Sequence, residues 1–301
     1  MVERSGAVSV VIPHYGDPEP AASLVDQLRE QKGVAAIQII IVDDASPQPF
    51  PPMNDALLVR RDSNGGFGAA VNTGAALATH PLLLVLNSDL EIGPTVVRDL
   101  VAAAEPWQPT VASPQVIGHN GAPQWAGRHF PRTRHYVVEW LTPLARYRTR
   151  PSLHEAVGHD TRCTTGATIP VDWVIGAALL MPLDHFRAVG GFDESFHMNC
   201  EEVDLQNRLR QRGIPAMFLG TVTVTHEGGG SSDPGKRRRW LVSSRLHYAQ
   251  KWHDGPTRQR LALTGASLVN FTVNLGRQLA GRPLRATTVL REELGYLWER
   301  A

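Results

Sequence analysis

The sequence contains few cysteines and no run of apolar residues long enough to suggest a membrane-spanning helix. Its 301 residues include only Cys163 and Cys200, which are too few for a disulfide framework and are not spaced as zinc ligands. Residues 1–7 are short and polar, and residues 8–12 have only the length of a strand. We therefore expect no signal peptide and a cytoplasmic protein. The missing G-x-G-x-x-G pattern disfavours a nicotinamide-dependent oxidoreductase.

Charge is distributed unevenly along the chain. The net charge of +1 conceals a basic C-terminal region, because residues 231–301 carry 13 Lys and Arg against 5 Asp and Glu. That region has a net charge of +8, which leaves −7 for residues 1–230. A basic region favours anionic partners such as a diphosphate or a membrane surface. No nucleic-acid partner is expected, since the body lacks interleaved basic and aromatic residues.

The first 60 residues predict alternating strands and helices. Residues 8–12 form a β-branched run closed by Pro13, and residues 21–31 have leucines at helical spacing. A second apolar strand covers residues 37–42, and a short third strand covers residues 56–60. Strand, helix and strand in this order predict a parallel pair with a right-handed crossover. The fold class is therefore α/β, with a Rossmann-like, mostly parallel central sheet flanked by helices.

Polar residues follow two of these strands. Asp43 and Asp44 end the second strand, and the buried run at residues 82–86 stops at Asn87, Ser88 and Asp89. Ligands of open α/β sheets bind beyond the carboxyl ends of the strands. Carboxylate and amide oxygens suit Mg²⁺ or Mn²⁺ bound to a diphosphate. Considered alone, the same residues also form ordinary polar turns.

A glycine-rich loop lies between these two strands. Residues 64–74 read NGGFGAAVNTG and open into a predicted helix that continues to Ala78. Glycines allow close backbone approach, and a helix N-terminus attracts anions. A purely structural turn is the competing interpretation.

Two adjacent acids begin a later predicted helix. Asn199 is expected to cap this helix, which runs to Gly213 and carries Glu201 and Glu202 in its first turn. The helix dipole stabilises negative charge there. Successive helical residues point about 100° apart, so the two carboxylates cannot face the same spot. One acid is expected to face a substrate, unless both simply stabilise the helix.

The C-terminal region predicts amphipathic helices. After a glycine turn at residues 228–230 comes an arginine run, and residues 258–279 follow as a helix with a leucine stripe at Leu261, Leu268, Leu275 and Leu279. A second stripe contains Leu290, Leu294, Leu297 and Trp298. These helices are too short and polar for a membrane span. Contact with the inner membrane leaflet, packing on the catalytic body and packing on a second subunit of a homodimer all remain open.

The ordered motifs resemble family 2 glycosyltransferases with the GT-A fold. VVIPHYGD, IIIVDDAS, NGGFGAAVNTG and VLNSD follow one another, and VDWVIGAALLM is similar to a central strand of bacterial rhamnosyltransferases. VGGFDESFHMNCEEVD and THEGGGSS extend the resemblance to Ser232. It implies a nucleotide-sugar half at residues 1–110 and an acceptor and catalytic half at residues 111–230. Residues 231–301 would form a basic helical extension.

The resemblance also implies roles for particular residues. The metal motif Asp-x-Asp appears here as Asn87-Ser88-Asp89, so Asp89 and His226 would hold Mg²⁺ or Mn²⁺. Glu202 would be the general base, with Glu201 in reserve. The donor-binding residues would be Pro13, Tyr15, Asp43, Asp44, Ser46, Asn64, Gly65, Gly66, Asn72, Asn87, Ser88, Asp89 and Arg237. Trp173, Gly176 and Ala177 would bind the acceptor, although Trp173 also suits core packing. Trp125, Arg128 and His129 could shape the same pocket.

The implied reaction is an inverting sugar transfer. The donor would be a dTDP- or UDP-sugar, with rhamnose from dTDP-rhamnose as the best guess. The acceptor would be a hydroxyl of a cell-envelope glycan or of a polyprenyl-linked glycan. Because Asn87 and Glu202 replace commoner acids, a noncatalytic sugar-nucleotide or glycan-binding protein is the alternative.

Overall fold

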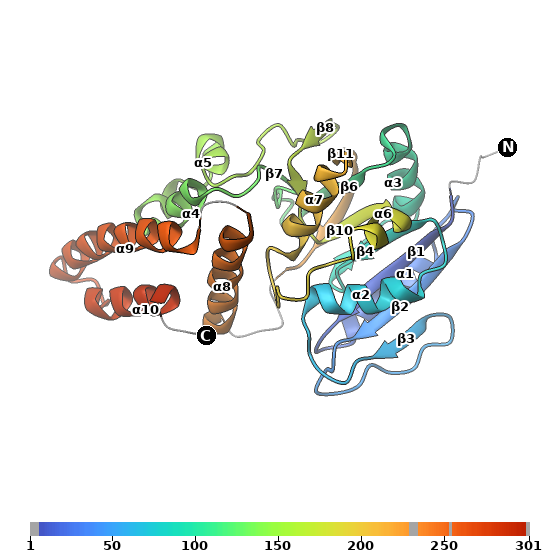
Figure 1. The fold of residues 1–301 in the computed structure, drawn as a ribbon, viewed down its shortest axis with the longest axis horizontal. Helices are drawn as coiled ribbons and strands as arrows, with labels where there is room; N and C mark the ends of the chain where they lie inside the picture. Colours follow the sequence, from blue (N-terminus) through green and yellow to red (C-terminus); the bar gives the residue numbers. More distant parts are fainter. Residues whose placement is uncertain (1–5, 229–233, 253–254, 299–301) are drawn as a thin grey trace. The chain divides into compact units, whose positions relative to one another are not determined.

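The chain divides into two compact units. In this computed structural model, residues 6–228, 234–252 and 255–298 are described. The first unit comprises Met1–His129 and Arg162–Ser232, and the second comprises Phe130–Thr161 and Asp233–Ala301. The first unit contains the sheet, whereas the described part of the second is helical (Figure 1).

The first unit is built on one large sheet. Its strands follow the order β3-β2-β1-β4-β10-β6-β11-β5, and β8 pairs with β11. Four neighbouring strands are parallel: β1 (Val8–His14), β2 (Ile37–Asp43), β3 (Leu57–Arg60) and β4 (Leu82–Leu86). The remaining members are β5 (Leu90–Glu91), β6 (Val111–Ile117), β8 (Thr168–Val171), β10 (Ala178–Pro182) and β11 (Ala216–His226). A separate ribbon pairs β7 (Gly127–Arg128) with β9 (Trp173–Val174).

The sheet is mixed, although a mostly parallel one was predicted. Strand β10 is antiparallel to both β4 and β6, so it reverses the chain direction in the middle of the sheet. Beyond it, β6 and β11 are parallel again, while β5 and β8 pair with β11 antiparallel. The α/β class is confirmed, and parallel pairing holds for the N-terminal strands and for β6 with β11.

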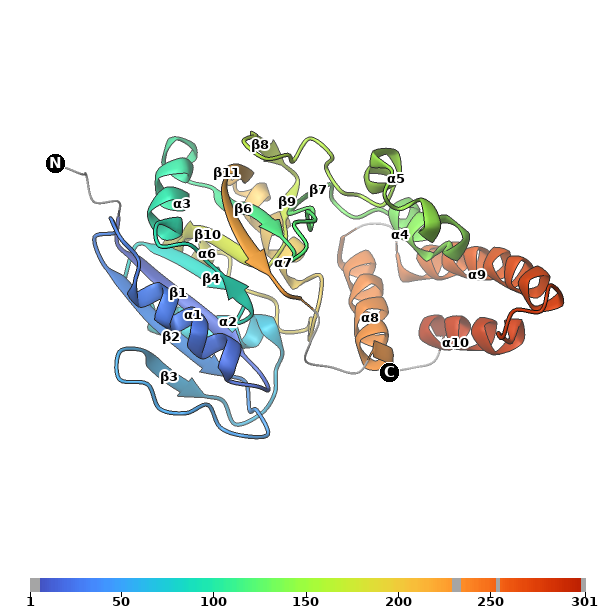
Figure 2. The ribbon, with the colours of Figure 1, turned by 180° about the vertical axis from the view of Figure 1, so that it is seen from behind.

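Helices cover both faces of this sheet. They are α1 (Glu19–Arg29), α2 (Phe67–Leu77), α3 (Val96–Ala104), η1 (Glu105–Trp107), α6 (Leu183–Ala188) and α7 (Glu201–Gln211). Figures 1 and 2 show α1 and α2 on opposite faces of the parallel strands. A Cβ at Gly74 would lie 2.5 Å from Cγ1 of Val11, so the absence of a side chain there lets α2 sit directly on β1.

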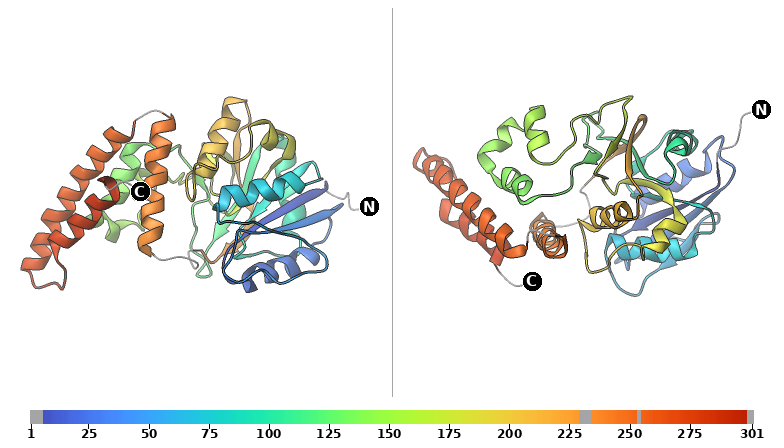
Figure 3. Two further views of the ribbon diagram at one scale, coloured as in Figure 1. Left: turned by 60° about the horizontal axis from the view of Figure 1, so that its bottom comes forward. Right: turned by 45° about the horizontal axis from the view of Figure 1, so that its top comes forward.

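The second unit is helical and has a small core of its own. Its elements are α4 (Thr133–Trp140), η2 (Thr142–Tyr147), α5 (Pro151–Ala156), α8 (Pro234–Trp252), α9 (Pro256–Leu279) and α10 (Ala286–Trp298). Figure 3 shows α9 and α10 side by side. The core consists of Tyr136, Trp140, Val242, Leu246, Leu263, Ala266 and Leu297. None of the helices within the described ranges is long and apolar enough to cross a membrane.

The grouping of residues 130–161 and the extent of β1 differ from the sequence-based expectations. Residues 130–161 group with the C-terminal helices, because Tyr136 and Trp140 pack into that core; the functional division at residues 110 and 230 stays a prediction. Strand β1 continues through Pro13 to His14. Pairing of β1 with β4 ends at Val11, so no strand on that side needs a backbone N–H from Pro13, which has none to donate.

Helix α7 also begins differently from the prediction that Asn199 caps it. Cys200 occupies the N-cap position with φ of 69°, and within the described chain no side chain makes a capping hydrogen bond there. Asn199 shares this left-handed conformation, also with φ of 69°. Two consecutive left-handed residues turn the chain sharply into α7, which sets where the two glutamates point.

Candidate functional site

The end of β4 meets the end of β11 in a polar cluster. Nε2 of His226 lies 3.1 Å from Oδ1 of Asp89 and 3.1 Å from Nδ2 of Asn87. The N–H of Gly228 donates to the other carboxylate oxygen of Asp89 at 2.9 Å. Burial opposes ionisation of Asp89, but the bonds from His226 and Gly228 outweigh it and lower its pKa. Asp89 is therefore an anion held beside an imidazole nitrogen.

Gln124 fixes the orientation of the His226 ring. Its amide nitrogen donates to the backbone carbonyl of His226 at 2.8 Å, which leaves Oε1 facing Nδ1 of the ring at 2.7 Å. Nδ1 therefore carries a proton, and Nε2 is the ring nitrogen directed towards Asp89 and Asn87. A carboxylate oxygen and an imidazole nitrogen at this distance would suit a cation that took the place of the proton between them.

The pair falls short of a complete metal cage. Among the residues that the structure describes, no group of three or more His, Cys, Asp or Glu side chains could hold a metal ion. A cation bound by Asp89 and His226 would thus need further ligands from a bound substrate. Divalent ions held in this way by few protein groups commonly take phosphate oxygens as their remaining ligands.

The two glutamates of α7 point to different surroundings. The Cβ of Glu201 lies 3.7 Å from the position that a Cβ on Gly68 would occupy, and the side chain is buried. The Cβ of Glu202 lies 3.7 Å from the corresponding position on Gly176. The two Cβ atoms therefore lie beside different segments, and that of Glu202 lies beside the predicted acceptor segment. That the two carboxylates cannot face one spot stays a prediction.

Burial raises the pKa of both carboxyls. Desolvation raises that of Glu201 well above its usual value, and the neighbouring charge of Glu202 raises it further. Desolvation also raises the pKa of Glu202, although the nearby Arg128 guanidinium opposes that rise. In both residues Oε2 is buried and has no hydrogen-bond partner among the described residues. A carboxylate with an unused oxygen and a raised pKa is better suited to accept a proton than an ordinary surface carboxylate.

Two short segments connect the acidic pair to the β4 end. The carbonyl of Ala177, next to Gly176, accepts the N–H of Asn87 at 2.9 Å. Residues 124–128 supply Gln124 to His226 at one end and Arg128 to the surroundings of Glu202 at the other. Through these links the structure brings Asn87, Asp89, His226, Gly176 and Glu202 into one region of the first unit.

Asp43 and Asp44 are occupied by internal contacts. Asp43 is 1% exposed and accepts the N–H groups of Ser46 and Phe50 as well as the Arg60 guanidinium. These bonds lower its pKa although burial alone would raise it. Asp44 is 4% exposed and accepts the N–H groups of the glycine loop, Gly65 at 3.0 Å and Gly66 at 2.8 Å. Their contact with a nucleotide stays a prediction, and the structure shows that both shape the loops around the strand ends.

Asn72 is similarly engaged. Its amide donates to the Phe192 carbonyl at 2.9 Å and accepts the Phe192 N–H at 2.8 Å. It also donates to Glu194 at 2.9 Å. The side chain thus clamps the segment after Gly191 onto α2, and contact with a sugar is a further role that stays a prediction.

The remaining predicted donor residues differ in their environment. Tyr15 and Asn64 are exposed, whereas Ser46 is buried and its hydroxyl accepts the Gly16 N–H at 3.0 Å. Pro13 and Ser88 are half-buried beside these loops. Arg237 belongs to α8 in the second unit, so its contact with a phosphate stays a prediction. Of the predicted glycine turn at residues 228–230, only Gly228 lies within the described residues.

Trp173 is 8% exposed, and its indole N–H donates to the His129 carbonyl at 2.9 Å. The Arg128 guanidinium lies 5.6 Å from its ring centroid. Trp173 therefore supports the position of Arg128 from within the core, and its contact with an acceptor stays a prediction.

Sequence reasoning missed two residues of this region. Gln124 carries no motif, and it lies 102 positions from the His226 that it orients. His14 is buried at the end of β1, and its ring lies 4.9 Å from that of Phe50. Desolvation lowers the pKa of His14 despite the opposing charge of Asp43. The position of His14 directly after the apolar run of β1 could have flagged it, since polar residues at the ends of other strands are candidate site residues.

Comparison with known proteins identifies the family. The model of glycosyl transferase family 2 matches residues 9–173, which is more than half of the chain. This chain belongs to glycosyl transferase family 2. The predicted resemblance is thereby confirmed, and the matched region includes the end of β4 and the ribbon strand that carries Trp173.

Similar proteins also include a curated relative and two solved structures. An N-acetylglucosaminyl-diphospho-decaprenol L-rhamnosyltransferase of Mycobacterium tuberculosis is 26% identical over 218 residues, which cover 63% of this chain and 66% of that protein. A mannosyltransferase of Pyrobaculum calidifontis, solved with GDP-Man and Mn²⁺, has a TM-score of 0.59 at 15% identity. That match covers 100% of this chain and 89% of the other.

The second structure is GalNAc-T7 with UDP, GalNAc and Mn²⁺. Its TM-score is also 0.59, at 17% identity, and the match covers 84% of this chain and 49% of the other. At these identities the two structures establish the fold, which is the predicted GT-A fold.

Proposed function

We propose that this family 2 glycosyltransferase moves a sugar from a nucleotide-diphosphate donor to an acceptor hydroxyl with inversion at the anomeric carbon. One observation carries the proposal: a cation-compatible Asp89–His226 pair and a high-pKa Glu202 lie in one region, joined through residues 124–128 and 176–177. An inverting transfer needs these two functions and no enzyme nucleophile.

Asp89 and His226 would hold the divalent ion, Mg²⁺ or Mn²⁺. When bound, the ion would neutralise charge on the departing diphosphate. Two solved structures of this fold contain Mn²⁺, which supports the choice of cation. Asn87, at the position where the family motif has an acid, contacts Nε2 of the His226 ring through its amide nitrogen, which is a donor, and adds no charge. The lone pair of Nε2 and the anionic Asp89 together fit a cation.

Glu202 would act as the general base. Its carboxylate would take the proton of the acceptor hydroxyl, whose oxygen attacks the anomeric carbon opposite the leaving nucleotide. The bond to the diphosphate oxygen breaks in the same displacement, which inverts the configuration. Glu201, buried against α2, has its pKa raised by desolvation and by the charge of Glu202, so it would stay protonated more readily than its neighbour. The positive charge of Arg128 would attract the Glu202 carboxylate and so help to position it.

The curated relative supports the finer assignment. Its name specifies rhamnose transfer to a diphospho-decaprenol-linked glycan. We therefore propose dTDP-rhamnose or another dTDP- or UDP-sugar as donor, and a cell-envelope or polyprenyl-linked glycan as acceptor, at the cytoplasmic side of the cell membrane.

Thermal stabilisation by a panel of dTDP-, UDP- and GDP-sugars, with and without Mn²⁺, tests the donor site. A ligand that binds the native state raises its apparent stability by mass action. We expect a Mn²⁺-dependent rise with one nucleotide family, lost in Asp89→Asn and in His226→Ala. Asp62→Asn, an exposed acid of the same unit, is the matched control and should behave as wild type. A rise that survives in Asp89→Asn would contradict the cation site, and donor binding without any transfer would favour the noncatalytic alternative.

A further inference from the structure

Helix α9 has its polar side turned inward. Its buried side chains are mostly polar or small: Gln259, Leu263, Ala266, Ser267, Asn270 and Asn274. Four leucines are exposed instead, from Leu275 at 39% to Leu279 at 81%, with Leu261 and Leu268 between these values. Residues spaced by seven and four positions share one helix face, so these leucines form a continuous stripe opposite the buried side. We call these four residues the α9 stripe.

Specific hydrogen bonds hold the helix in this orientation. Asn270 donates to the Trp140 carbonyl at 2.9 Å and to Oε1 of Glu293 at 3.0 Å, and it accepts the Thr142 N–H at 2.9 Å. The Trp140 indole donates to Ser267 at 2.8 Å. Rotating α9 to bury its leucines would break these buried bonds and leave polar groups unpaired. The outward stripe is therefore fixed by the packing of the second unit.

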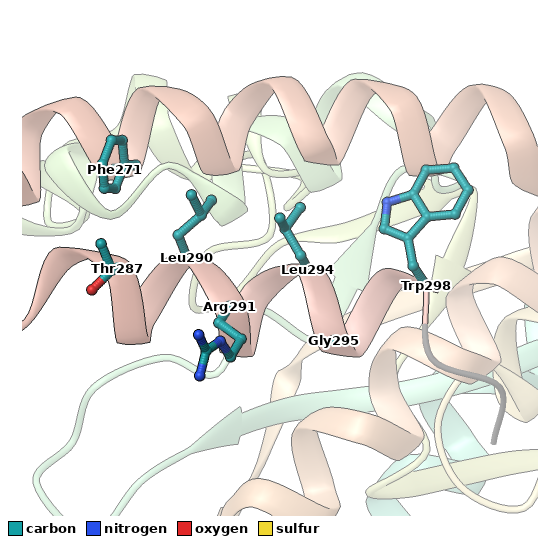
Figure 4. Close-up of a pocket in the computed structure, with 7 residues that line it drawn as sticks. All are labelled: Phe271, Thr287, Leu290, Arg291, Leu294, Gly295 and Trp298. Atoms are coloured by element: carbon teal, nitrogen blue, oxygen red, sulfur yellow. The ribbon is translucent and has the colours of Figure 1, made fainter.

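A groove adjoins the stripe. It lies between α9 and α10, has a volume of about 530 Å³, and is lined by Phe271, Thr287, Leu290, Arg291, Leu294, Gly295 and Trp298. Figure 4 shows Leu290, Leu294 and Trp298 pointing from α10 towards α9. Trp298 remains half exposed, and its indole donates to Thr264 at 3.0 Å. Exposed apolar surface of this extent with a polar rim marks an interaction site.

The rim of this surface is basic. No acidic residue lies within Pro256–Leu279, which contains three arginines, and Arg282, Arg285 and Arg291 follow. Of the two acids of α10, Glu293 is buried against Asn270 and only Glu292 is exposed, so arginines predominate. A symmetric contact with a second copy would bring these arginines close to one another, which like-charge repulsion disfavours. An anionic surface would neutralise them.

We propose that the α9 stripe and the adjoining groove dock onto an anionic phospholipid bilayer. The stripe runs 18 residues, or about 27 Å, which lets α9 lie in the plane of the interface. Its leucines and Trp298 would enter the acyl boundary, while the flanking arginines meet lipid phosphates. This surface belongs to the second unit alone and does not depend on the donor site.

Co-sedimentation of the full chain with vesicles tests the proposal. We expect binding to phosphatidylcholine vesicles that contain phosphatidylglycerol, weaker binding to phosphatidylcholine alone, and a loss of binding at high salt. Leu261→Glu with Leu268→Glu should weaken the partition at least about tenfold, because each leucine loses its burial in the bilayer. The control is Leu57→Glu with Leu77→Glu, two exposed leucines of the first unit, which should bind as wild type.

Melting curves of both double variants establish that they fold, and Leu261→Gln with Leu268→Gln serves if the glutamates do not. Equal partition of the stripe variant and the wild type would overturn the proposal, as would no binding of the wild type to either vesicle. Light scattering tests the competing hypothesis that a second copy of the chain covers the stripe. A wild-type dimer that binds no vesicles and that Leu268→Glu dissociates would assign the stripe to a second copy. Donor binding should be unchanged throughout.

Discussion

Replacing Asn72 with alanine separates its clamping role from a direct role in donor binding. The substitution removes an acceptor from the N–H of Phe192 and a donor from its carbonyl, at a half-buried residue. Each such bond contributes about 1 kcal/mol, so Asn72→Ala should lower the free energy of unfolding by about 2 kcal/mol. The additional bond to Glu194 is exposed and should add little.

This loss is measurable as a fall in melting temperature. For a unit of this size, about 2 kcal/mol corresponds to a fall of about 4–8 °C. Differential scanning calorimetry without donor resolves the effect, and Asn64→Ala is the matched control for stability because Asn64 is an exposed asparagine near the same helix. We expect the control to melt within about 1 °C of wild type.

The opposite pattern would refute the clamp. If Asn72→Ala melts with the wild type and donor binding weakens about tenfold or more, its amide contacts the donor directly and the bonds to Phe192 are dispensable. If stability falls and the donor dissociation constant at low temperature changes less than about threefold, the clamp is its main role.

Three further outcomes follow from the structure. Gly66→Ala should lower the free energy of unfolding by at least about 3 kcal/mol or prevent folding, because φ is +86° and the new Cβ would lie 1.7 Å from the His197 carbonyl oxygen. The control Gly265→Ala, at an open helical position, should melt at or above the wild-type temperature. Equal stability of both variants would contradict this packing. Because the pKa of Glu201 is raised in the folded state, its contribution to stability is present at low pH and is lost as pH rises from about 4.5 through the folded-state pKa. The stability of Glu201→Gln relative to wild type, measured by urea unfolding, should therefore increase over that range. A difference that does not change with pH would contradict this expectation. Gln124→Ala should weaken the Mn²⁺ affinity, measured by titrating Mn²⁺ in the presence of donor, about 10–100-fold. An unchanged Mn²⁺ affinity would show that the orientation of His226 by Gln124 is unimportant.

Much of the first unit could be predicted because its signals are local. The buried runs of β2 and β4 and the leucine spacing of α1 each lie within a short window, and the strand ends place Asp43 and Asp89 at one edge. The antiparallel β10 could not be predicted in this way, because its direction depends on pairing with strands far away in sequence. Gln124 could not be predicted for the same reason, because it lies 102 positions from the His226 that it contacts.

The site shows where residue types are insufficient. Asp44 and Asn72 have the chemistry of donor ligands, yet their oxygens are filled by backbone N–H groups of distant loops. Asn199 has the chemistry of a helix cap, but the left-handed turn at Cys200 displaces it. In α9, periodicity correctly predicted the leucine stripe but not its outward direction, which is set by the polar contacts of Asn270 and Ser267.

The rate of sugar transfer by Glu202→Gln, measured beside its donor affinity, tests the central claim most directly. General base catalysis contributes about 10²–10⁴-fold, so we expect turnover to fall at least about 100-fold while the donor dissociation constant stays within about twofold. Glu201→Gln, which changes the buried neighbour, should retain more turnover than Glu202→Gln. Turnover of Glu202→Gln within about threefold of wild type, at unchanged donor affinity, would contradict Glu202 as the base.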